Sequence, residues 1–216
     1  PGNHDVRWRS VDMINPDLPR SLTNGEKVTA LLRDDHRRRI LFGSMADYAQ
    51  FVRRLLSDYR KHPMFCDPLY SYAQPISSGK PSVAVIGLNS AWLSGFSKDS
   101  HGKREDRGKL LVGDKQIGDA IREAEDCTLR IALMHHPPSC LREFDQMDVS
   151  NWLRSACDFV LLGHLHVPNF EQERALERET INIPAGTVYK NRRWLNGYNL
   201  VQLSFAYQVI GAFVER

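Results

Sequence analysis

The sequence lacks the features of a membrane protein, a disulfide scaffold and a strongly basic nucleic-acid binder. It has no apolar run near the ~18 to 20 residues that a membrane-spanning helix needs. Its four cysteines, Cys66, Cys127, Cys140 and Cys157, form no CxxC pair and have no regular spacing, so neither a zinc ribbon nor a disulfide framework is indicated. The 29 lysines and arginines against 26 acidic residues give a net charge of only +3. We therefore expect free thiols, no membrane partner and a cytoplasmic location, and bulk charge does not indicate nucleic-acid binding.

The composition is that of a folded domain with a sizeable core. Of the 216 residues, 42% are hydrophobic and 25% are charged, and no repeat or linker divides the chain. Basic residues cluster locally, at 37–39, 103–109 and 192–193. We interpret each cluster as a solvated face, with a phosphate-binding patch as the alternative. One domain over residues 1–216 is therefore expected.

Alternating strand and helix patterns in the middle of the chain predict an α/β fold. Short β-branched or apolar runs predict buried strands, and amphipathic spacing predicts the helices between them. The expected strands are Ser82–Leu88, Leu129–Met134 and Asp158–Leu162, and the expected helices are 114 to about 125 and a short one near Val149–Ala156. Strand, helix and strand in succession are typical of α/β domains.

The first third of the chain gives weaker patterns. Residues Val6–Phe42 are polar, with a turn signal at Asn24-Gly25, and are expected to form loop and irregular helix. Ser44 has the character of an N-cap, and apolar positions at helical spacing predict an amphipathic helix from Met45 to about Tyr59. The segment Lys61–Ser82, rich in Pro, Gly and Ser, is expected to be a loop that could overhang a site.

The C-terminal segment is expected to form strands, and the loop after Ser90 is a candidate for a substrate entrance. Residues 180–183, 198–204 and 207–214 are expected to be consecutive strands, and antiparallel pairing would then close the domain. The loop after Ser90 could frame a substrate entrance, with an ordinary surface loop as the alternative. Its aromatic and basic residues are Trp92, Phe96, Lys98, His101, Lys103 and Arg104.

Three short motifs put metal-seeking side chains where strands are expected to end. They are Gly2-Asn3-His4-Asp5, His135-His136-Pro137-Pro138 and Gly163-His164-Leu165-His166. In an extended backbone His164 and His166 point to the same side. Their Cα separation of about 6 to 7 Å would suit two metal ions ~3.5 to 4 Å apart, each binding one imidazole. A lone HxH is a weak signal, whereas one that follows an apolar strand and two other motifs indicates a metal site.

The other two motifs each offer candidate ligands. His135 and His136 should face opposite sides if the strand geometry persists, so one of the two is expected to bind metal. Asn3 offers an amide oxygen, which can occupy a metal position without adding charge. Asp5 is suited to hold the His4 imidazole in one tautomer and to stabilise its protonated form.

In this order the motifs resemble the calcineurin-like metallophosphoesterase superfamily, whose signature runs DxH, GDxxD, GNHD or GNHE, a His motif and GHxH. The resemblance implies a β-sandwich flanked by helices around a dinuclear metal centre. It implies Asn3, His135, His164 and His166 as metal ligands, with His135 preferred to its neighbour. It also implies that His4, supported by the carboxylate of residue 5, is catalytic and lies close to the leaving group.

Only the last three motifs of that signature are present, so the resemblance implies an N-terminally truncated domain. The Asp of DxH and the bridging Asp of GDxxD would lie upstream, and the parent chain could carry additional domains. The four expected ligands are neutral, whereas two divalent ions carry four positive charges, so carboxylates must come from elsewhere. We therefore expect these 216 residues alone to be weakly active or inactive.

Two stretches mimic the missing motifs and are rejected as ligands. Asp34-Asp35-His36 has the form of DxH, but it lies downstream of the GNHD motif in an Arg-rich polar stretch. Gly118-Asp119 begins a GDxxR stretch, but it lies inside an amphipathic helical pattern.

The function implied by the resemblance is metal-dependent phosphoester hydrolysis. We expect a phosphodiesterase that attacks a small or nucleotide substrate with a hydroxide bridging two metal ions. Mixed nitrogen and oxygen ligands suit Mn, Fe or Zn better than Ca. One alternative is a DNA exonuclease or repair-type phosphoesterase, which the basic clusters favour and the modest net charge does not. Another is a non-catalytic regulatory module that retains the fold.

Overall fold

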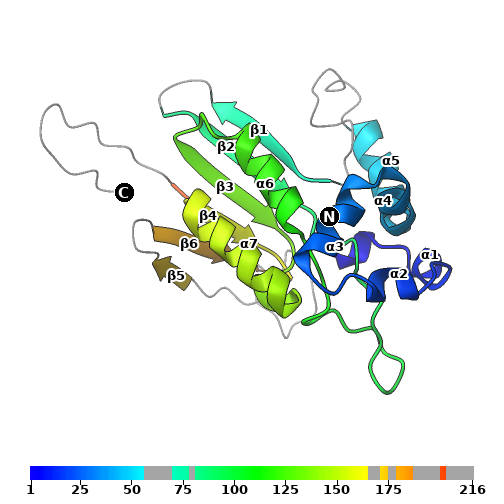
Figure 1. The fold of residues 1–216 in the computed structure, drawn as a ribbon. Helices are drawn as coiled ribbons and strands as arrows, with labels where there is room; N and C mark the ends of the chain where they lie inside the picture. Colours follow the sequence, from blue (N-terminus) through cyan, green and yellow to red (C-terminus); the bar gives the residue numbers. More distant parts are fainter. Residues whose placement is uncertain (56–69, 78–80, 165–170, 175–178, 187–199, 203–216) are drawn as a thin grey trace, which may run out of the picture.

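The structure is a computed structural model that describes residues 1–55, 70–77, 81–164, 171–174, 179–186 and 200–202 (Figure 1). Its centre is a six-stranded sheet with the order β1-β2-β3-β4-β6-β5. The strands are β1 (Tyr72–Ser77), β2 (Val83–Leu88), β3 (Leu129–Met134), β4 (Phe159–Leu162), β5 (Glu171–Arg174) and β6 (Glu179–Pro184). Strands β2, β3, β4 and β6 are parallel, and β1 and β5 join antiparallel at the two edges. The fold is therefore mixed α/β with a mostly parallel sheet.

Two helices, α6 (Asp114–Glu123) and α7 (Glu143–Ala156), lie across one face of the sheet (Figure 1). On this face of β2, β3 and β4, Ala84, Ile86, Ala132 and Val160 are almost completely buried. Arg130 lies on the same face, where its guanidinium donates to carbonyl oxygens at the ends of both helices, on Ala124 and on Ala156. The opposite face carries half-buried apolar side chains, and it forms the floor of the cavity described below.

Short helices gather beside the carboxyl ends of the parallel strands (Figure 1). They are α1 (Trp8–Asp12), α2 (Asp17–Arg20), α3 (Gly25–Arg33), α4 (Asp35–Phe42) and α5 (Ala46–Leu55). Regular helices cover more of Val6–Phe42 than the loop and irregular helix that were expected there. Asn24 caps α3 by accepting from the Lys27 N–H at 3.0 Å, and Asp34 caps α4 by accepting from two backbone N–H groups. Both polar residues therefore start helices, although a turn was expected at Asn24-Gly25.

The helix α5 begins and packs differently from the prediction. A 3-10 turn, Gly43–Met45, precedes it, and the Ser44 hydroxyl donates to the Leu41 carbonyl instead of capping the helix. Phe51 and Leu55, two members of the predicted apolar stripe, are 58% and 65% exposed. The rest of the predicted helix, 56–59, lies outside the described residues.

The predicted middle strands and the helix from residue 114 are confirmed, whereas α7 begins at Glu143, six residues before the predicted start, and the sheet's edges are corrected. Strand β1 falls within Lys61–Ser82, which was expected to be loop, and its Pro75 is tolerated because β1 is an edge strand. The predicted strand over 180–183 is confirmed as β6, but β6 runs parallel to β4 and pairs antiparallel only with β5, a strand that was not predicted. Residues 200–202 form no strand, and the remainder of 198–204 and all of 207–214 lie outside the described part.

The core extends from the sheet into the N-terminal helices. Trp92 is completely buried and packs on Phe42 with ring centroids 5.4 Å apart, so it does not line a substrate entrance. Cys127, Cys140 and Cys157 are free thiols. No helix in the described residues has both the length and the apolar character that crossing a membrane would require.

A buried carboxylate joins the start of α6 to α7 and makes stability depend on pH. The Asp145 side chain is 2% exposed and accepts the backbone N–H groups of Val112 and Gly113 at 2.6 and 3.0 Å. Burial raises its pKa to about 6. A pKa raised on folding contributes stability below the unfolded value, and this contribution is lost as pH rises through the folded value.

We therefore expect Asp145 to remove about 2 kcal/mol of unfolding free energy between pH 4 and pH 6, out of about 3 kcal/mol over the whole titration. Urea unfolding of wild type and Asp145→Asn at each pH measures this, because the difference between the two proteins should change by that amount over this range. Asp126→Asn, at an exposed position, controls for the change in charge. A constant difference between wild type and Asp145→Asn would show that the buried carboxyl does not titrate there.

Candidate metal centre

The register of the parallel strands brings three sequence-distant strand ends together. Leu88 pairs with Met134, and Met134 pairs with Leu162, so β2, β3 and β4 end side by side. The residues that follow each strand must then emerge at one edge of the sheet. By this arrangement Ser90, His136 and His164 become neighbours, although 74 positions separate the first from the last.

Three imidazoles converge at this edge. One ring nitrogen from each of His135, His136 and His164 can be chosen so that all lie within 4.8 Å of one another. The rings of the two adjacent histidines are 4.7 Å apart between centroids, and their distances to the His164 ring are 5.4 and 4.7 Å. Such a set of imidazoles is a donor arrangement suited to a transition-metal ion.

The expectation that His135 and His136 face opposite sides is corrected by this geometry. Strand β3 ends at Met134, and the next two residues are in a bend, so the alternation of an extended strand no longer applies. Pro137 and Pro138 follow directly, and neither has a backbone N–H with which to continue the sheet. Both histidines are therefore available to the same centre.

His136 is oriented by a serine that the sequence reading did not assign to the site. Ser90 Oγ lies 3.0 Å from His136 Nδ1 and also accepts the His136 backbone N–H at 3.1 Å. Both residues are fully buried. Within the described part of the chain, His136 Nε2 has no hydrogen-bond partner. A buried polar atom left without a partner carries a desolvation cost, and a metal ion would remove it.

Burial keeps the imidazoles of His135 and His136 neutral. It lowers the pKa of His136 to about 2, with the charges of His135 and His164 as the next causes. It lowers the pKa of His135 to about 4, with the charge of His164 next. Only a neutral imidazole has a lone pair to donate to a metal, so the environment favours the ligand form.

Two glycines form a cradle for the His135 ring. A Cβ on Gly2 would lie 2.8 Å from atoms of that ring. A Cβ on Gly163 would lie 2.8 Å from the ring's Nδ1 and 3.3 Å from the backbone carbonyl oxygen of His135. The glycine of the GNHD motif and the glycine of the GHxH motif therefore both make room for the histidine of the third motif. The close approach of Gly163 to His135 is what requires glycine here.

The backbone at His164 is strained. Its φ is 66°, and it is the one non-glycine residue in the described segments with a positive φ. This left-handed conformation costs a non-glycine residue free energy, and such costs concentrate at functional sites. The conformation directs the backbone away from the extended form assumed for the HxH motif. His166 lies outside the described residues.

The GNHD motif lies against the same centre. It forms a 3-10 helix, Asn3–Asp5, whose Asn3 Oδ1 is 3.1 Å from His135 Nε2. His4 is exposed and contributes to lowering the pKa of His135, after burial and the other neighbouring charges. Asp5 accepts the Gly2 N–H at 2.8 Å, and the described residues show no hydrogen bond between its carboxylate and His4. The predicted support of His4 by Asp5 is therefore absent in this conformation.

The rejected look-alikes have structural roles elsewhere. Asp34 is the N-cap of α4. Asp119 pairs with Lys115 at 2.6 Å and with Arg122 at 3.3 Å on the surface of α6. Neither carboxylate is among the groups that could join the three imidazoles.

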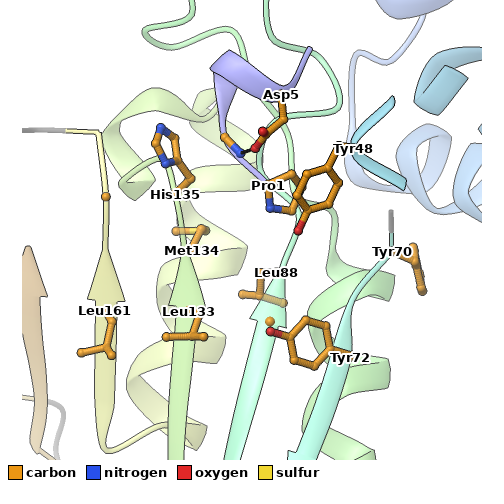
Figure 2. Close-up of a pocket in the computed structure, with 13 residues that line it drawn as sticks. Pro1, Asp5, Tyr48, Tyr70, Tyr72, Leu88, Leu133, Met134, His135 and Leu161 are labelled. Atoms are coloured by element: carbon orange, nitrogen blue, oxygen red, sulfur yellow. Dashed lines mark hydrogen bonds between the residues drawn. The ribbon is translucent and has the colours of Figure 1, made fainter. Parts of the chain in front are cut away.

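A cavity of about 400 Å³ opens beside His135, on the sheet face opposite α6 and α7 (Figure 2). Its apolar walls come from the strand ends, at Leu88, Leu133 and Leu161. Tyr48 and Tyr72 line it as well, and burial raises the pKa of both hydroxyls. Its volume is within the range of small-molecule sites.

The donors described here fit a metal ion. Three imidazoles and the Asn3 oxygen are the nitrogen and oxygen donors that Zn, Mn or Fe accept. They carry no negative charge, and no carboxylate of the described residues belongs to the group formed by His135, His136 and His164. The described donors can therefore hold one divalent ion, while a second ion needs carboxylates in addition.

The sequence matches no protein-family model, and no curated protein matches it either. The centre therefore has to be judged by its own geometry, in which one asparagine and three histidines from three sequence-distant motifs converge at the carboxyl edge of a mostly parallel sheet.

Proposed function

We propose that this domain is a metal-dependent phosphoester hydrolase of the calcineurin-like type, acting as a phosphodiesterase on a small or nucleotide substrate. The observation that supports this most is the fully buried His136, whose Nε2 lacks a partner among the described residues and faces two further imidazoles. The other ring nitrogen of His136, Nδ1, is hydrogen-bonded to Ser90 Oγ. A ligand for a cation is the simplest role left for Nε2.

Each residue of the centre has a distinct part in this proposal. His135, His136, His164 and Asn3 hold the metal ion, with His166 as a further ligand by resemblance. Bound divalent ions stabilise the charge that develops on a transferring phosphoryl group and lower the pKa of water. Ser90 orients His136, and the two glycines beside His135 fix its ring. By resemblance, the exposed His4, which lies between Asn3 and Asp5 in the GNHD motif, donates a proton to the departing oxygen of the substrate.

The DNA-directed alternative gains no support from the basic cluster at 37–39. Arg37 pairs with Asp34 at 3.4 Å, and Arg38 pairs with Asp35 at 2.8 Å. Their charges are locally compensated, so they do not form a free phosphate-binding surface. The substrate proposed here is therefore a small phosphodiester.

The experiment that tests this function uses the full-length protein, freed of metal by EDTA and reloaded with Mn²⁺. Hydrolysis of bis(p-nitrophenyl) phosphate should require Mn²⁺ and should be lost in His136→Ala. Hydrolysis that survives EDTA, or a protein that never cleaves the ester, would contradict the proposal.

Replacing His4 by Ala should affect substrates according to their leaving groups. We expect turnover of 2′,3′-cyclic AMP, whose leaving group is an alkoxide, to fall on the order of 10²-fold, because a general acid is lost. Turnover of bis(p-nitrophenyl) phosphate should fall much less, since nitrophenolate leaves without a proton. His101→Ala, at another exposed histidine, is the matched control. Equal losses on both substrates would exclude the acid role.

A further inference from the structure

A second cavity, of about 580 Å³, lies apart from the histidines. It is enclosed by α1, α2 and the segment 93–98, together with the side chains of Lys109 and Arg142. None of the residues of the candidate metal centre lines it. The volume is that of a site for a small organic molecule.

The charges around this cavity do not balance. Arg20, Lys98, Lys109 and Arg142 line it, and Asp12 is the one carboxylate among the lining residues. The Asp12 carboxylate is shared, because it pairs with Lys98 at 3.2 Å and with Arg104 at 2.7 Å. Positive charge is therefore in excess within the cavity.

Arg142 is the most informative of these cations. Its guanidinium is half-buried and donates to the carbonyl oxygens of Leu22, Pro19 and Lys109, at 2.5, 3.2 and 3.3 Å. Burial lowers the pKa of Arg142, while the charge of Asp145 acts in the opposite direction. Carbonyl groups fix the guanidinium in place but carry no net charge, and no carboxylate of the described residues forms an ion pair with it. Each guanidinium nitrogen donates to one carbonyl, so one N–H group on each of the two terminal nitrogens is left to donate to an anion.

The remaining walls of the cavity are apolar. Val11, Ile14 and Leu93 line it, and Phe96 packs partly against the core beneath. The Lys109 ammonium has no ion-pair partner in the part of the chain that the structure describes, and its side chain is exposed. The cavity therefore combines an apolar wall with two cations that lack carboxylate partners.

We propose that this cavity binds a small organic phosphate, with the anionic group at Lys109 and Arg142 and the apolar body against Leu93 and Phe96. Arginine and lysine together recognise a phosphate through charge-assisted hydrogen bonds. The apolar wall then selects an esterified or aryl phosphate over the free ion. This site does not depend on the metal centre.

Calorimetric titration of phenylphosphonate into the EDTA-treated protein tests the proposal, because the probe cannot be hydrolysed and the metal centre is empty of ions. We expect saturable binding at one site, about tenfold tighter than that of inorganic phosphate or phenol. Lys109→Glu should weaken the binding at least about tenfold, since a charge-assisted hydrogen bond becomes a repulsion.

Lys103→Glu makes the same change in charge at an exposed lysine outside the cavity, and it should leave the affinity within about twofold. Equal weakening by the two variants would reduce the effect to overall charge and overturn the proposal. So would the absence of saturable binding, or binding of inorganic phosphate as tight as that of phenylphosphonate.

Discussion

Replacing Gly163 by Ala should lower the affinity of the protein for Zn²⁺ on the order of 10- to 100-fold. The added Cβ would lie 2.8 Å from His135 Nδ1, closer than such atoms approach in proteins, so the ring must move. The neighbouring backbone oxygen of His135, 3.3 Å away, leaves little room on that side. Competition with a fluorescent zinc chelator measures the affinity of wild type and variant.

Gly43→Ala is the matched control for this substitution. A Cβ at Gly43 meets nothing within 4 Å, and its φ of −59° suits alanine. Its zinc affinity should equal that of the wild type. If Gly163→Ala also bound zinc as tightly as the wild type while remaining folded, His135 would not be a ligand held by the glycine cradle.

The second large effect is expected on stability, from Gln116→Leu. The Gln116 amide is fully buried on α6 and completes the hydrogen bonding after strand β2. Its Oε1 accepts the Asn89 N–H at 2.5 Å, and its Nε2 donates to the carbonyl oxygens of Asn89 and Val112 at 3.1 and 2.9 Å. Leucine has a similar size but pairs with none of these groups. We expect a loss of about 4 kcal/mol in unfolding free energy, measured by urea denaturation.

Gln50→Leu, at an exposed position of α5, should change the same free energy by less than about 0.5 kcal/mol. A comparable loss in both variants would mean that the buried amide has no special role. Because Gln116 fixes the backbone just before Ser90, its replacement should also weaken zinc binding. Loss of stability without any change in zinc affinity would separate the helix contact from the metal centre.

The strands that deliver the metal-seeking residues were predictable from sequence. Strands β2, β3 and β4 are short apolar runs, and each appears within one residue of its predicted bounds. Their common edge was not predictable, because the order and register of parallel strands depend on packing between distant segments. The contact between Ser90, which follows β2, and His136, which follows β3, was therefore not predicted.

Local rules failed where the backbone departs from regular geometry. Opposite orientations of His135 and His136 were expected from strand alternation, but β3 ends one residue before them. At His164 the left-handed backbone likewise departs from the extended form assumed for the HxH motif. Such departures carry a conformational cost that sequence patterns do not reveal.

The second cavity shows a different reason for failure. It gathers side chains from residue 11 to residue 142, and no short motif joins them. Lys98 had been considered with Trp92 as a frame for one entrance, whereas the structure buries the tryptophan and places the lysine in another cavity. Only the folded chain brings these charges together.

The most direct test of the metal centre is X-ray absorption at the zinc edge of the zinc-loaded protein. The signal from imidazole rings counts the histidines bound to the ion. We predict at least three imidazoles and no sulfur ligand, with one imidazole fewer in His136→Ala. A wild-type spectrum with one imidazole or none, or an unchanged spectrum in His136→Ala, would contradict the convergence of these histidines on a metal ion.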